Sequence, residues 1–168
     1  APRGVHQNGW TGGRLDPVRL AKVGMEVSRG LAAAHAMGVV HRDLKPENVL
    51  VDASGRCVLS DFGIARAFDR TSPDANRATR VIGTPAYMAP EQVMGEDVGP
   101  FSDLYTLGVL MFEACAGALP FTGENAIAVA VARVHNPAPD IRAIVPDLPA
   151  PIAGVIGRCL QRDRARRP

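Results

Sequence analysis

Residues 41–48 read HRDLKPEN and place a carboxylate, an ammonium group and an amide in one short polar segment between two apolar stretches. Asp43, Lys45 and Asn48 supply these three groups. Taken alone, Asp43 and Lys45 would be explained by a solvent-exposed ion pair. Convergent polar groups of these types are also the composition of an active site. We call residues 41–48 the HRD loop and examine what surrounds it.

Two short apolar runs follow the HRD loop, Val49–Val51 and Cys57–Leu59, and five small or polar residues join them. This pattern predicts a β-hairpin. If Val49 pairs near Leu59 in antiparallel register, Asn48 and Asp61 leave the open end of the hairpin side by side. One oxygen from each side chain can then share a hard cation such as Mg²⁺, which prefers oxygen ligands.

Two further motifs follow, DFG at residues 61–63 and GTPAYMAPE at residues 83–91. With the HRD loop they stand in the order and approximate spacing of the eukaryotic-type protein-kinase signature set. Over residues 14–168 the chain therefore resembles the C-terminal lobe of a bacterial Ser/Thr protein kinase. The resemblance implies a protein-kinase-like C-terminal lobe (α+β), mainly α with a small β-hairpin, with the N-terminal lobe absent.

The resemblance implies a role for each polar residue of these motifs. Asp43 would be the catalytic base or positioning carboxylate for the substrate hydroxyl. Lys45 would be catalytic and cofactor-binding, facing the γ-phosphoryl group of ATP. Asn48 and Asp61 would bind the cofactor through the Mg²⁺ ions that bridge its phosphates. Lys45 and Thr84 fit the Ser/Thr-specific pattern, with Thr84 in the substrate (P+1) segment.

Other residues are implied to support the site without reacting. His41 is expected to pack beneath the HRD loop as part of the scaffold. Asp103 resembles the aspartate that fastens this loop from beneath. Glu91 resembles the glutamate that pairs with a late arginine, here Arg167. All of these are structural supports by the resemblance.

The stretch between Asp61 and Glu91 shows no sustained hydrophobic period and is strongly polar in its middle. A loop of about 30 residues in a compact domain is usually functional or disordered. Arg42 is implied to bind a phosphate in this activation loop, because a guanidinium grips phosphate oxygens well. Thr79 is the first expected phosphosite, followed by Thr71. The alternative is that these are solvent-facing hydroxyls.

Helical signals lie on both sides of these motifs. Asp16 is a suitable N-cap for a helix from Pro17 to Met37. Ser102 is expected to cap a second helix, apolar nearly all round and therefore buried, that ends at Gly117. Two more helices are expected, at about residues 125–135 and 151–161.

Composition excludes several classes of protein. The chain has 168 residues, 46% of them apolar, which suits one globular domain. The formal net charge of +2 is too balanced for nucleic acid as the main partner. No apolar run reaches the ~20 residues of a membrane span. The three cysteines lack a zinc or disulfide spacing and are expected to be buried free thiols in the cytoplasm.

Complete kinases carry a Gly-rich loop and a strand lysine upstream of the HRD motif, and residues 1–13 show neither. We expect residues 1–13 to be a ragged linker or end, residues 14–168 to be a partial kinase domain, and the chain to be excised from a longer protein. Any membrane anchor of that parent would lie outside this segment.

Two functional hypotheses follow. The first is a catalytic-lobe fragment of a Ser/Thr kinase that transfers the γ-phosphate of ATP to protein substrates and is inactive in isolation. Its expected partners are ATP, Mg²⁺, proteins with Ser or Thr acceptors and the missing N-terminal lobe. The alternative is a non-catalytic, pseudokinase-like protein-binding module.

Overall fold

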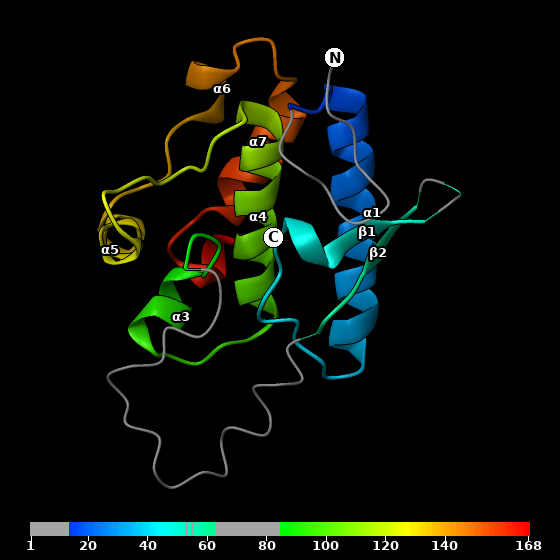
Figure 1. Ribbon diagram of the computed structural model, residues 1–168, viewed down its shortest axis with the longest axis horizontal. Coiled ribbons are helices and arrows are strands. Elements are labelled where there is room, and N and C mark those ends of the chain that lie inside the picture. Colours follow the sequence, from blue (N-terminus) through cyan, green and yellow to red (C-terminus); the bar gives the residue numbers. More distant parts are fainter. Residues whose placement is uncertain (1–13, 53, 55, 63–84) are drawn as a thin grey trace, which may run out of the picture.

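The structure is a computed structural model that describes residues 14–52, 54, 56–62 and 85–168. Within these residues the fold is mainly α-helical with one two-stranded antiparallel sheet, which confirms the predicted fold class. Figure 1 shows α4 at the centre, α1 and α7 beside it and the hairpin lying across α1. The elements in chain order are α1 (Pro17–Ala36), a 3-10 turn (Pro46–Asn48), β1 (Val49–Val51), β2 (Cys57–Leu59), α3 (Pro90–Met94), α4 (Pro100–Ala116), α5 (Ala126–His135), α6 (Ile141–Ile144), α7 (Ala150–Cys159) and a second 3-10 turn (Arg164–Arg166).

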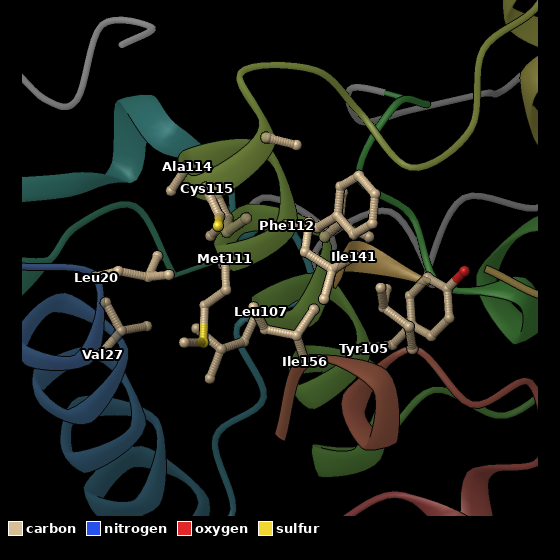
Figure 2. Packing of buried hydrophobic residues seen from close by; sticks show 14 of the residues in the cluster. Leu20, Val27, Tyr105, Leu107, Met111, Phe112, Ala114, Cys115, Ile141 and Ile156 are labelled. Carbon is tan, nitrogen blue, oxygen red and sulfur yellow. The ribbon is translucent and has the colours of Figure 1, made fainter. Parts of the chain in front are cut away.

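The core forms around α4, which is buried on nearly every side, as its apolar sequence predicts. Its side chains pack against α1 on one side and α7 on the other. Figure 2 shows Leu107 and Met111 of α4 between Val27 of α1 and Ile156 of α7. Burying each such side chain stabilises the fold by roughly 1.5–3 kcal/mol.

The first helix follows its sequence signals closely. A side-chain oxygen of Asp16 accepts hydrogen bonds from the backbone N–H groups of Val18 and Arg19, both at 3.0 Å. The helix ends at Ala36, one residue before the predicted Met37. The N-terminal cap and the proline after it account for the sharp start.

The predicted start of α4, with Ser102 as its N-cap, was wrong by three residues. The N-cap is Gly99 and the helix begins at Pro100, whose fixed φ angle suits a first helical position. Ser102 lies in the first turn, where its hydroxyl accepts a hydrogen bond from the N–H of Gly99 at 3.3 Å. The helix ends at Ala116, one residue before the predicted Gly117, which is its C-cap and adopts a left-handed φ of 74°.

Helix α5 begins after the N-cap Asn125 and ends at His135, as expected, whereas α7 ends two residues before the predicted Gln161. Helices α3 and α6 were not predicted. They have five and four residues, too few for a hydrophobic period to show.

The hairpin forms in the predicted register, with Val49 opposite Leu59. Asp52 closes its turn by accepting hydrogen bonds from the Ser54 hydroxyl and from the Ser54 and Arg56 backbone. These bonds, led by that of the Ser54 hydroxyl, hold the pKa of Asp52 well below its usual range. Glu26 of α1 accepts the N–H of Cys57 at 2.5 Å and so joins the hairpin to the helix.

All three cysteines are free thiols; Cys115 and Cys159 are buried, while Cys57 is half-buried. Burial and the neighbouring Glu26 carboxylate raise the pKa of Cys57 to about 11. Among the described residues, no helix is both long enough and apolar enough to cross a membrane.

The contact between α4 and α7 leaves no room at Gly108. A Cβ added there would lie 2.7 Å from Cys159 Cβ and 3.3 Å from the Cys159 carbonyl carbon. We expect Gly108→Ala to lower the free energy of unfolding by about 1–3 kcal/mol through overpacking. Urea denaturation monitored by circular dichroism measures the change.

Gly154→Ala on α7 is the matched control, because a Cβ added at Gly154 would have no neighbour within 4 Å. It should leave stability unchanged or raise it by up to about 1 kcal/mol through helix propensity. A Gly108→Ala protein as stable as the parent would contradict the packing described for α4 and α7.

Candidate active site

The HRD loop connects α1 to β1, and Asp103 in the first turn of α4 holds its start. One Asp103 carboxylate oxygen accepts the backbone N–H of His41 and the other accepts that of Arg42, both at 2.8 Å. The His35 Nε2 atom of α1 lies 2.7 Å from the first of these oxygens. Asp103 is only 1% exposed, so these partners compensate for the burial of its carboxylate. The HRD loop is thereby fixed to the central helix.

Arg42 has a left-handed backbone with φ 66°, which is uncommon for a residue with a Cβ. Its backbone is held on both sides. Asp103 accepts its N–H, and the side-chain NH₂ of Gln92 donates to its carbonyl oxygen at 2.9 Å. The side-chain amide oxygen of Gln92 in turn accepts the N–H of Ala89 at 2.8 Å. Sequence reasoning missed Gln92, since its partner lies far away in the chain.

His41, the first residue of the HRD loop, is fully buried. Its Nε2 atom is 3.0 Å from the carbonyl oxygen of Ser60, and its ring centroid is 4.6 Å from that of Phe62. These contacts connect the HRD loop to the residues that follow β2. The complete burial of His41 is compatible with the scaffold role that the resemblance implies.

Three of the predicted site residues converge within the HRD loop. The Lys45 ammonium donates to the Asp43 carboxylate at 2.9 Å, with both side chains roughly a quarter to a third exposed. The Asn48 side-chain NH₂ donates to the backbone carbonyl of Asp43 at 2.9 Å. The Asn48 backbone carbonyl accepts the N–H of Ser60 at 3.0 Å. These hydrogen bonds hold the HRD loop together and join it to Ser60, the residue after β2.

Asp61 follows β2 at the open end of the hairpin, in an exposed position with a left-handed φ of 53°. Its carboxylate accepts a 3.3 Å hydrogen bond from the Ser60 hydroxyl. Asp61 directly follows Ser60, whose backbone N–H donates to the Asn48 carbonyl. Thr71, Thr79 and Thr84 lie outside the described residues.

The donor chemistry of Asn48 and Asp61 fits a magnesium ion. The NH₂ group of Asn48 is used on Asp43, which leaves its amide oxygen for a cation. Asp61 adds an exposed carboxylate. Among the described residues, no group of three His, Cys, Asp or Glu forms a metal site alone. Two protein oxygens suit Mg²⁺, which completes its shell with water and phosphate oxygens.

A buried ion pair joins α3 to the end of the chain. The Arg167 guanidinium donates to both oxygens of the Glu91 carboxylate, at 2.7 and 2.9 Å. It also donates to the Phe101 carbonyl at 2.8 Å, and the Ser102 hydroxyl donates to Glu91 at 2.8 Å. Burial alone would raise the pKa of Glu91, but the bonds from Arg167 and Ser102 outweigh it and the pKa lies below its usual value.

A second, half-buried contact fixes the segment that precedes α3. The Tyr87 hydroxyl donates to the Glu113 carboxylate of α4 at 2.8 Å. Burial and the Glu113 contact raise the pKa of Tyr87 well above its usual value. Burial raises the pKa of Glu113, helped by the nearby Glu47 charge and opposed by the bond from Tyr87. Glu113 was missed as a partner, because only the fold places it beside Tyr87.

A family model for the protein kinase domain matches residues 6–168. The chain belongs to this family. Curated relatives include the serine/threonine-protein kinase PknA of Mycobacterium tuberculosis (strain H37Rv), 41% identical over 142 residues, which are 84% of this chain and 32% of the relative. The serine/threonine-protein kinase drp72 of Corynebacterium efficiens is 42% identical over 152 residues, 90% of this chain and 28% of the relative.

The serine/threonine-protein kinase PknL of Mycobacterium tuberculosis (strain H37Rv) is 37% identical over 155 residues, 92% of this chain and 38% of the relative. The chain thus spans about a third of the length of the curated relatives it matches. These findings confirm the resemblance to bacterial Ser/Thr protein kinases.

The Glu91–Arg167 pair makes a pH-dependent contribution to stability. We expect Glu91→Gln to lower the free energy of unfolding at pH 7 by about 3 kcal/mol, because it leaves the buried Arg167 charge uncompensated. The folded-state pKa of Glu91 is depressed, so its contribution is present above the unfolded pKa of about 4.3 and is lost as the pH falls through the folded value. Denaturation at pH 7 and below pH 4 tests this.

The exposed Glu124→Gln is the control and should leave stability unchanged at both pH values. The difference between the parent and Glu91→Gln should shrink in acid. A difference that is absent at pH 7, or that stays constant below pH 4, would be incompatible with a stabilising ionised pair.

Proposed function

We propose that this chain is the catalytic lobe of a Ser/Thr protein kinase that transfers the γ-phosphate of ATP to Ser or Thr hydroxyls of proteins. The observation that carries the proposal is the convergence of Asp43, Lys45 and Asn48 on a loop whose backbone is bonded to α4. Family membership and the names of the relatives support the reaction class.

Asp43 is proposed to orient the substrate hydroxyl and accept its proton. Its backbone carbonyl is held by Asn48 and its carboxylate by Lys45, which limits the directions in which the carboxylate can point. Positioning supplies much of the rate enhancement in phosphoryl transfer. The Lys45 ammonium, 2.9 Å from Asp43, is close enough to balance negative charge that develops on the transferred group.

Asn48 and Asp61 are proposed to bind the magnesium ions of the nucleotide. When bound, ATP with Mg²⁺ supplies the phosphoryl group and neutralises its charge. The protein contributes the two oxygen ligands and keeps them at the same end of the hairpin through the Asn48 to Ser60 backbone bond. The sequence pattern of Lys45 and Thr84 supports a Ser or Thr acceptor.

Arg42 is proposed to bind the phosphate group of a phosphorylated activation loop. Thr79 and then Thr71 are the proposed phosphorylation sites. Its Nε is buried and has no hydrogen-bond partner among the described residues. A phosphate with about −1.5 to −2 charges would satisfy such a donor. We also place the lobe in the cytoplasm, where ATP and reduced thiols are available.

The proposal predicts a dependence on the upstream kinase lobe. This chain alone should transfer little or no phosphate to a generic protein substrate, because it lacks a phosphate-binding Gly-rich loop. Joined to the upstream kinase lobe of PknA, it should label Ser or Thr. In that chimaera, Asp43→Asn and Asp61→Asn should each lower the rate by about 100-fold or more. Radiolabelled ATP and phosphoamino-acid analysis measure both.

The exposed Asp97→Asn is the matched control and should retain full activity. Labelling of tyrosine alone, or indifference to Asp61→Asn, would contradict the assignment. A folded chimaera that transfers nothing but binds protein partners would favour the pseudokinase-like alternative.

A further inference from the structure

Residues 85–88 form a turn that leads toward α3, and we call them the 85–88 segment. Each of its four carbonyl oxygens accepts a hydrogen bond from a side chain of another element. Thr106 of α4 donates to the Tyr87 carbonyl at 3.1 Å. The other three carbonyls are bonded to one residue of α5, Arg133.

The Arg133 guanidinium spans the 85–88 segment like a fork. One terminal nitrogen donates to the Pro85 carbonyl at 2.6 Å and to the Met88 carbonyl at 2.7 Å. The other donates to the Ala86 carbonyl at 2.5 Å. The guanidinium carbon also lies 5.7 Å from the centroid of the Phe121 ring. A planar group with several fixed donors suits three carbonyls that converge from one turn.

Arg133 is a buried cation whose hydrogen-bond partners are backbone carbonyl oxygens. It is 0% exposed, and burial lowers the pKa of its guanidinium. Among the residues that the structure describes, no carboxylate forms an ion pair with it. Burying a charge without a counter-ion costs free energy unless polar groups compensate for it. The carbonyl oxygens of Pro85, Ala86 and Met88 accept hydrogen bonds from the Arg133 guanidinium and so compensate in part for its burial.

We infer that Arg133 is a positioning residue that sets the peptide-binding shape of the 85–88 segment and thereby the affinity for protein substrates. This inference rests on the proposed kinase function. The 85–88 segment directly follows Thr84, the residue that the family resemblance places against the substrate. The hydrogen bonds of Arg133 go to this segment and not to Asp43, Asn48 or Asp61, so its effect falls on the peptide rather than on ATP.

The test uses the active chimaera with the PknA upstream lobe and a Ser-containing peptide. Arg133→Met keeps much of the length of the side chain but removes its donors, and we expect the KM for peptide to rise about tenfold. The KM for ATP and kcat should stay within about twofold. Arg133→Lys should restore part of the peptide affinity, because it retains the charge but not the planar fork. A general loss of stability would not produce this pattern.

Arg158→Met is the control, since Arg158 is exposed on α7 and its loss should leave every kinetic constant unchanged. Melting temperatures show whether each variant folds. If Arg133→Met does not fold, the peptide KM of Arg133→Lys tests the inference.

An active chimaera in which the folded Arg133 variants keep the parental peptide KM overturns this inference alone. Parallel changes in kcat and both KM values also overturn it, because they indicate a general structural role. A parent chimaera that transfers no phosphate overturns the proposed function and this inference with it.

Discussion

The backbone of the HRD loop depends on the Asp103 carboxylate. The start of this loop is neither helix nor strand, so its N–H groups have no regular partners, and leaving one buried and unpaired costs about 1–3 kcal/mol. Asp103 accepts two of them from the first turn of the most buried helix. The position of Asp43 is therefore determined by the packing of α4 against α1 and α7.

Further contacts extend the same arrangement to α3 and to the end of the chain. Gln92 donates to the Arg42 carbonyl, while Asp103 accepts the Arg42 N–H. The Glu91–Arg167 pair fixes α3, which carries Gln92, against α4 and the C-terminal residues. Arg133 then fixes the turn that leads into α3. The loop that holds the candidate site and the segment proposed to bind substrate are thus parts of one bonded framework.

Sequence could predict the elements whose signals are local. The hairpin register follows from two short apolar runs, and α1 follows from its cap and apolar spacing. The start of α4 was misplaced because Ser102 is a good cap in isolation, whereas its hydroxyl bonds Gly99 and Glu91. The motifs gave Asp43, Lys45 and Asn48, but no local signal could give Gln92 or Arg133, whose partners lie 45 to 50 residues away.

The most direct test of this account is amide hydrogen exchange at His41 and Arg42 in Asp103→Asn. Asparagine keeps the side-chain size but replaces one acceptor oxygen with an NH₂ group, so at least one of these N–H groups loses its partner. The account predicts exchange at least roughly tenfold faster at one or both of these amides, with protection retained at Val109 in the middle of α4. Unchanged protection at both His41 and Arg42 would contradict the central role of Asp103.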